Sequence, residues 1–214
     1  MTRLSVNVNK IATLRNARGG DVPNLLKITR DIINFGADGI TVHPRPDERH
    51  ITYQDTLDLA KMIREEYPTV EFNVEGFPSK KFQTLVEQSR PDQITLVPDP
   101  PGILTSNQGW NLQQNVSYLR EIIKKIKTNT NRICLFINPD PNIIKHVIHT
   151  QAHAIELFTG EYADTFGTNK INSVIKKYIK TANKAYESNI GVNAGHDLNL
   201  DNLKFFNRNI TCLD

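Results

Sequence analysis

Short apolar runs alternate with longer amphipathic stretches along all 214 residues of the chain. The runs are almost continuously aliphatic, as expected for parallel strands that are buried on both faces. In the stretches between them, apolar residues recur at helical spacing. The pattern predicts eight strands, at residues 4–9, 39–43, 70–75, 93–98, 133–138, 154–159, 190–194 and 210–213.

Start and stop signals support helices between these strands. Pro23 opens an apolar stripe that contains Leu25 and Ile32, and Gly36 closes it. A second stripe spans residues 57–63. Further helices are predicted at residues 80–88, 111–127, 142–149, 170–187 and 200–206.

Eight strands separated by seven helices predict a (β/α)8 TIM barrel that forms one domain over residues 1–214. An open, doubly wound sheet is the alternative. A Rossmann-type sheet is not supported, because no Gly-x-Gly-x-x-Gly motif follows any predicted strand. The sequence stops at Asp214, inside the predicted eighth strand, so we expect the closing loop and the last helix of the barrel to be missing from it.

The charge balance is too mild to predict a nucleic-acid partner, with 26 basic and 23 acidic residues and a net charge of +3. The basic stretch at residues 120–132 is interleaved with apolar residues at helical spacing, which indicates a solvated helix face. No apolar run is long enough to cross a membrane. Cys134 and Cys212 are the only cysteines, and the first lies in an apolar strand pattern. We therefore expect a cytoplasmic protein.

Candidate chemistry is concentrated after the second predicted strand. His43 ends this strand, and a loop that contains Pro44 and Pro46 carries Arg45 and His50. Imidazoles transfer protons near neutral pH, and guanidinium groups bind phosphate or carboxylate through paired hydrogen bonds. The segment therefore predicts acid-base chemistry on an anionic small molecule.

Polar residues also follow the other predicted strands, at the end where barrel enzymes place their active sites. Glu75 is a candidate general base, and a salt bridge to a neighbouring arginine is its alternative. Glu156 could stabilise a cationic intermediate or form a structural ion pair. His196 follows small residues and is a candidate proton donor, with a packed structural histidine as its alternative. The strand-end set is Asn7, Asn9, His43, Glu75, Thr105, Asn138, Asp140, Glu156, Asn193 and His196.

Two further kinds of site need consideration. Lys10, Arg15 and Arg18 follow the first strand, and the paired glycines after them would let a loop bend around a phosphate. A zinc site made of His43, Glu75 and His196 is less favoured, because none of these three residues has another of them at a local ligand spacing such as His-x-x-x-His. His146, His149 and His153 are better explained by a surface helix and the approach to a strand.

Five segments, at residues 7–19, 36–52, 73–75, 155–164 and 192–196, together resemble the pyridoxine 5'-phosphate synthase family. The resemblance implies a (β/α)8 barrel that condenses 3-amino-2-oxopropyl phosphate with 1-deoxy-D-xylulose 5-phosphate. It also implies release of phosphate and water, no metal or organic cofactor, and an octamer assembled from dimers.

The resemblance assigns roles to individual residues. His43 and Glu75 match proton acceptors, His196 matches a proton donor, and Glu156 matches a position that stabilises the transition state. The matching substrate contacts are Asn7, Arg18, Arg45, His50 and Thr105.

The chain departs from the family pattern at three places. Asn9 and Lys10 replace an Asp-His pair, and we expect them to keep a substrate contact. Asp197 replaces a glycine and could place an anion near a phosphate. A Gly-His turn that contacts phosphate would lie beyond Asp214. A non-catalytic phosphosugar-binding barrel and a metal-dependent phosphosugar epimerase are the alternative functions.

Overall fold

The computed structural model describes residues 2–99, 108–128 and 131–214. It divides the chain into two compact units. The N-terminal unit comprises Arg3–Leu104 and Ile126–Arg132, and the C-terminal unit comprises Met1–Thr2, Thr105–Lys125 and Ile133–Asp214. The expectation of one domain over residues 1–214 stays a prediction.

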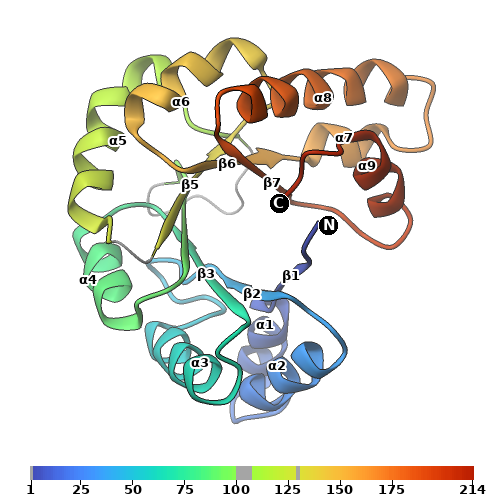
Figure 1. The fold of residues 1–214 in the computed structure, drawn as a ribbon. Coiled ribbons are helices and arrows are strands. Elements are labelled where there is room, and N and C mark those ends of the chain that lie inside the picture. The colour runs from blue at the N-terminus through green and yellow to red at the C-terminus, as the bar shows by residue number, and fades with distance from the viewer. Residues whose placement is uncertain (1, 100–107, 129–130) are drawn as a thin grey trace. The chain divides into compact units, whose positions relative to one another are not determined.

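The N-terminal unit is a run of parallel strands and connecting helices. β1 pairs with β2, β2 with β3 and β3 with β4, each in parallel register. Helices α2, α3 and α4 connect consecutive strands and lie outside them (Figure 1). The elements are β1 (Ser5–Asn7), α1 (Asn9–Arg18), α2 (Leu25–Asn34), β2 (Gly39–Val42), α3 (Tyr53–Glu66), β3 (Glu71–Gly76), α4 (Lys80–Ser89) and β4 (Gln93–Leu96).

The C-terminal unit repeats this βα pattern, with β5 paired to β6 and β6 to β7, again in parallel. α5 (Leu112–Ile126) precedes β5 (Arg132–Ile137), and the last residue of α5 and the first residue of β5 belong to the N-terminal unit. The other elements are the 3-10 turn η1 (Pro141–Ile143), α6 (Ile144–Thr150), β6 (Ala154–Phe158), α7 (Gly160–Thr165), α8 (Ile171–Glu187), β7 (Gly191–Gly195) and α9 (Leu203–Asn209).

Local sequence explains how the helices begin. Thr52 and Asp55 form a capping box at α3, in which the Asp55 N–H donates to Thr52 Oγ1 at 3.0 Å and the Thr52 N–H donates to Asp55 Oδ2 at 2.8 Å. These contacts satisfy N–H groups that the first turn of a helix leaves without partners. Asn24 and Ser79 accept from backbone N–H groups at the starts of α2 and α4 in the same way.

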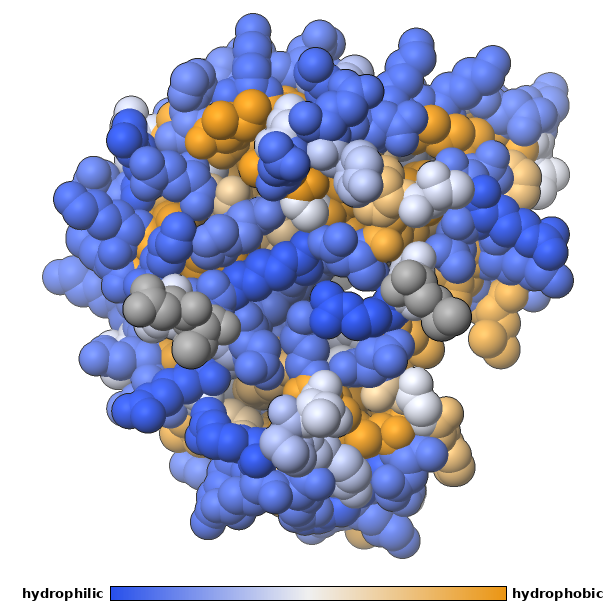
Figure 2. All heavy atoms as spheres, viewed as in Figure 1, coloured by the Kyte–Doolittle hydropathy of each residue, from blue (hydrophilic) through white to orange (hydrophobic). Residues whose placement is uncertain are grey.

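The apolar strand residues form the cores of both units, as the pattern predicted. Every residue of β2 and β4 is buried, and Cys134, Leu135 and Ile137 of β5 are fully buried. The face seen in Figure 2 is mainly hydrophilic, with smaller hydrophobic areas between the polar side chains. No helix in the described ranges is long and apolar enough to cross a membrane.

Two local predictions were wrong. Residues 9–18, interpreted as a phosphate-binding loop, form helix α1, and β1 ends at Asn7. Residues 210–213, predicted as the eighth strand, are not a strand: α9 continues to Asn209 and a turn follows. After this turn, the Asp214 N–H donates to the Val192 carbonyl of β7 at 3.0 Å.

Candidate active site

His43 lies directly after β2 and is fixed by α1. Its backbone N–H donates to Asn9 Oδ1 at 2.9 Å, and the Asn9 N–H in turn donates to Asn7 Oδ1 at 2.9 Å. The two asparagines therefore join the start of α1 to the end of β2. Sequence reasoning assigned both residues to substrate contact and missed this structural connection, because it depends on a helix that the sequence pattern did not reveal.

His43 faces the carboxylate of Glu75, which projects from the end of β3. His43 Nδ1 lies 3.7 Å from Glu75 Oε2, slightly beyond hydrogen-bonding distance. Burial lowers the pKa of His43 to about 3, and the positive charge of Arg45 and the His50 ring act in the same direction. His43 is therefore a neutral imidazole at neutral pH, able to accept a proton, with a carboxylate close by to stabilise the resulting cation.

Arg45 is buried, with only 8% of its surface exposed, beside the equally buried Asp99. The Arg45 guanidinium nitrogen Nη2 lies 3.7 Å from Asp99 Oδ2. Burial lowers the pKa of Arg45, whereas the charge of Asp99 opposes that shift. Arginine stays charged even so, because its ordinary pKa is far above neutrality. A cation held in this way is suited to an anionic ligand.

His50 is held in one tautomer by the following residue. The Ile51 N–H donates to His50 Nδ1 at 2.8 Å, so the ring proton of the neutral imidazole resides on Nε2. The His50 ring also lies edge-on to His43, with 6.4 Å between ring centroids. Burial lowers the pKa of His50, and the charges of Arg45 and Arg49 add to the effect. Nε2 is therefore a neutral hydrogen-bond donor.

The remaining basic residues of the N-terminal unit differ in their surroundings. Lys10 is exposed in the first turn of α1, and Arg18 ends this helix, with a side chain outside the described part of the structure. Arg15 is bound bidentately by Asp55, at 2.6 and 2.7 Å, so it has a structural contact. Arg49 pairs with Asp47 on the surface.

In the C-terminal unit, Glu156 of β6 is 9% exposed and faces β7. It is the register partner of Asn193, and Gly195 lies beside its carboxylate. A Cβ atom at Gly195 would lie 2.6 Å from Glu156 Oε1, which is shorter than real Cβ contacts. The glycine at this position therefore makes room for the carboxylate.

His196 follows β7 in a left-handed backbone conformation, with φ of 89°, and Asp197 has φ of 57°. His196 Nδ1 lies 2.6 Å from Asp197 Oδ2, and the ring packs edge-on against Phe158, with 4.8 Å between ring centroids. The Thr159 hydroxyl donates to the backbone carbonyls of Gly195 and His196. The carboxylate next in sequence thus fixes the imidazole and leaves Nε2 to meet a substrate.

Other predicted strand-end residues have structural contacts or lie outside the described residues. Asn138 Oδ1 accepts from the Gly109 N–H at 2.9 Å, and Asp140 caps η1. Thr105 lies outside the described residues.

The described residues include no group of three or more His, Cys, Asp or Glu side chains that could hold a metal ion. His146 and His149 lie on α6, as the surface-helix interpretation predicted. His153 precedes β6, where its Nδ1 accepts from the Ile133 N–H at 2.8 Å.

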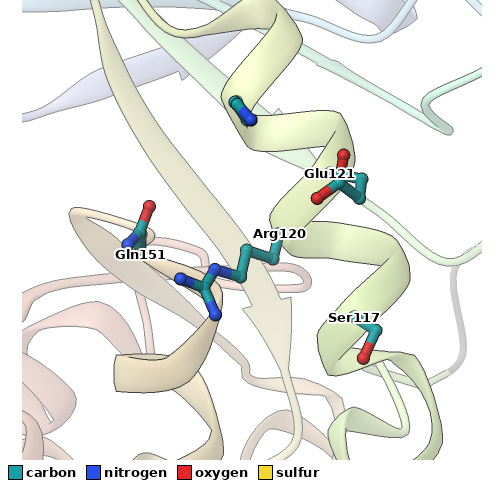
Figure 3. Close-up of a pocket in the computed structure, with 5 residues that line it drawn as sticks. Ser117, Arg120, Glu121 and Gln151 are labelled. Atoms are coloured by element: carbon teal, nitrogen blue, oxygen red, sulfur yellow. The ribbon is translucent and has the colours of Figure 1, made fainter.

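A polar hollow of about 420 Å³ lies elsewhere in the C-terminal unit. Figure 3 shows Arg120 reaching from α5 toward Gln151, which follows α6, with Ser117 and Glu121 on neighbouring turns. Arg120 and Lys124, which line this hollow, belong to the basic helix face that the sequence predicted to be solvated. None of the predicted catalytic residues lines it.

Comparison with solved structures shows the fold class. Phosphoribosyl anthranilate isomerase from Thermotoga maritima is 12% identical, with a TM-score of 0.57 over 99% of this chain and 85% of that chain. An HpcH/HpaI aldolase from Desulfitobacterium hafniense is 9% identical, with a TM-score of 0.60 over 99% of this chain and 84% of that chain. The fold is that of the β/α barrels, and seven parallel strands are described.

Sequence comparison is much closer. Pyridoxine 5'-phosphate synthase from Cytophaga hutchinsonii is 50% identical over 100% of this chain and 87% of its own length. The protein of that name from Flavobacterium johnsoniae is 49% identical over 98% of this chain and 86% of its own length. The family model described as pyridoxal phosphate biosynthesis protein PdxJ matches residues 4–214. The chain belongs to the PdxJ family of pyridoxal phosphate biosynthesis proteins.

Proposed function

We propose that His43 and Glu75 accept protons and His196 donates them in the pyridoxine 5'-phosphate synthase reaction. The activity itself follows from family membership, which makes the chain an enzyme of pyridoxine and vitamin B6 biosynthesis. The observation that carries the residue roles is the His43–Glu75 contact, in which a neutral imidazole lies 3.7 Å from a carboxylate.

The proposed reaction joins 3-amino-2-oxopropyl phosphate to 1-deoxy-D-xylulose 5-phosphate. The amine adds to a ketone and water leaves, after which an enolisable carbon loses a proton, phosphate departs and the ring closes. Proton removal requires an unprotonated base at neutral pH; the buried imidazole of His43 is unprotonated there, and the Glu75 carboxylate 3.7 Å away would stabilise the imidazolium that forms. Proton delivery to departing oxygen requires an acid, and His196 is the proposed donor.

The phosphorylated substrates would bind to the cationic and neutral hydrogen-bond donors. Arg45 is a buried cation, and His50 presents Nε2–H as a neutral donor. Asn9 uses its Oδ1 to hold His43, which leaves its side-chain N–H groups for a substrate oxygen. The further proposed contacts are Asn7, Lys10, Arg18 and Thr105.

Glu156 is the proposed stabiliser of a cationic intermediate, because its carboxylate is almost fully buried at 9% exposure. Asp197 was predicted to contact substrate. Its distance of 2.6 Å from His196 supports a role in orienting that imidazole, in addition to any contact with a phosphate.

The quaternary structure and location are also proposals. We propose a homo-octamer, by resemblance to the family. We also propose that the enzyme acts in the cytoplasm, where its doubly charged phosphorylated substrates would be retained because such anions cross membranes poorly.

The test is to supply both substrates to the purified chain and measure pyridoxine 5'-phosphate and inorganic phosphate. Equal amounts of the two products are expected, and treatment with a chelator should leave the rate unchanged. A folded protein that makes neither product would refute the proposed function. Metal-dependent turnover of a phosphosugar would instead support an epimerase.

A further inference from the structure

A chain of polar side chains crosses the interior of the N-terminal unit, one layer beneath His43 and Glu75. Asn73, in the middle of β3, is 3% exposed. Its Nδ2 donates to Thr41 Oγ1 of β2 at 3.2 Å, and its Oδ1 accepts from Thr95 Oγ1 of β4 at 3.1 Å. One carboxamide therefore connects three adjacent strands.

Hydrogen bonds extend this chain in both directions. The Ser5 and Thr41 hydroxyls lie 2.8 Å apart, Gln93 Nε2 donates to Thr95 at 3.4 Å, and Arg132 donates to Gln93 Oε1 at 2.8 Å. No buried side-chain nitrogen or oxygen among the described residues lacks a hydrogen-bond partner. A fully connected buried network of this kind fixes one arrangement of its strands, since a shift would leave buried polar groups unpaired.

The strand register relates this network to the proposed proton-transfer residues. Thr41 is the register partner of Asn73, and Thr95 is the register partner of Glu75. Side chains alternate along a strand, so Thr41 and His43 share one face, as do Asn73 and Glu75. The Asn73–Thr41 contact therefore lies about 7 Å below the His43–Glu75 contact, two residues earlier on the same two strands, whereas Thr95 lies at the level of Glu75.

The chemical character of this layer is unusual for its position. The interior of a β/α barrel is normally filled by branched aliphatic side chains, which pack without directional contacts. Here an amide and hydroxyls occupy the layer, and their hydrogen bonds have narrow limits of distance and angle. They constrain the spacing and rotation of β2 relative to β3 more tightly than aliphatic packing would.

We propose that Asn73 is a positioning residue, which holds β2 and β3 so that His43 and Glu75 keep the separation required for proton transfer. This inference rests on the proposed function, in which those two side chains accept protons. Asn73 itself acts through the strands and does not touch the reacting atoms.

The test compares Asn73→Leu, which keeps the approximate shape of the side chain and removes both hydrogen bonds, with Thr29→Val. Thr29 is also fully buried in the N-terminal unit, where its hydroxyl donates to the Leu25 carbonyl at 2.8 Å, far along the chain from His43. This control variant loses a buried hydrogen bond without affecting the proposed positioning.

Asn73→Leu should lower kcat by about 10- to 100-fold, because small displacements of reacting groups cost up to about that factor. KM for both substrates should change less than about twofold, since the substrate contacts remain, and Thr29→Val should keep wild-type kinetics. An unchanged kcat, or an increased KM with unchanged kcat, would overturn the proposal. If Asn73→Leu does not fold, Thr41→Val removes the hydrogen bond between Asn73 and β2 and should lower kcat in the same direction.

A second measurement does not depend on activity. The imidazole NMR signals of His43, assigned by their loss in His43→Gln, should move in the ligand-free Asn73→Leu protein and stay in place in Thr29→Val. Unmoved signals would overturn the positioning role even if the synthase activity is confirmed. If the His43 signals move in Asn73→Leu but the wild-type chain makes no product, the proposed function is refuted and the positioning role of Asn73 stands.

Discussion

The buried, neutral state of His43 predicts that acid destabilises this protein through one identifiable side chain. The pKa of His43 is about 3 in the folded protein, against an ordinary value of 6.5. As the pH falls below 6.5, the unfolded chain therefore binds a proton that the folded protein does not bind. The stability contribution is complete above pH 6.5 and is lost progressively as the pH falls toward 3.

The size of the effect follows from the difference in proton binding. Each pH unit within this window costs at most about 1.4 kcal/mol for one group. Integration from pH 7 to pH 5 gives a loss of about 2 kcal/mol from His43 alone. The calculated loss would be nearly the same for any pKa of His43 well below 5 in the folded protein. No large correction for solvent screening applies, because His43 is only 7% exposed.

The assay is urea unfolding at pH 7 and pH 5, followed by circular dichroism at one fixed protein concentration. The wild type should lose about 2 kcal/mol more than His43→Gln, whose side chain does not titrate. The contribution of His50 is present in both proteins and cancels. His149→Gln, which removes an exposed histidine, is the control and should behave as the wild type. Equal losses in wild type and His43→Gln would show that burial does not keep His43 neutral in the folded protein.

Three further outcomes follow from the structure. Glu75→Gln should keep the circular dichroism spectrum and lower turnover by at least about 100-fold, as expected for a general acid-base group; undiminished turnover would remove Glu75 from the mechanism. Gly195→Ala should fold and have a lower kcat, because the new Cβ would lie 2.6 Å from Glu156 Oε1 and displace that carboxylate. The measurement is kcat with both substrates at saturation, and a wild-type kcat would contradict a catalytic role for Glu156. Thr52→Ala should cost about 1 kcal/mol in urea unfolding through loss of the α3 cap, whereas Thr52→Ser should restore most of it.

Local pattern was sufficient for much of the fold. The apolar runs that became β2 to β7 and the amphipathic stretches that became α2 to α6 and α8 were all recognisable, because burial of one face imposes a period on the sequence. Helix α1 was missed because residues 9–18 have only a weak apolar stripe, with Ala12 its one buried apolar side chain. The turn after α9 was mistaken for a strand because Ile210 and Leu213 are apolar there.

The sequence also determined which residue types follow the strands, and therefore which reactions they can support. Histidines and glutamates can transfer protons, and arginines can bind anions. It determined nothing about their protonation or partners. Burial sets the pKa of His43, and a side chain 32 residues away, Glu75, supplies the nearby charge. The pairing of Thr41, Asn73 and Thr95 was equally hidden, because it depends on register between strands. Only the tertiary structure decides such matters, since periodicity is a property of neighbours along the chain, whereas desolvation and hydrogen bonding depend on neighbours in space.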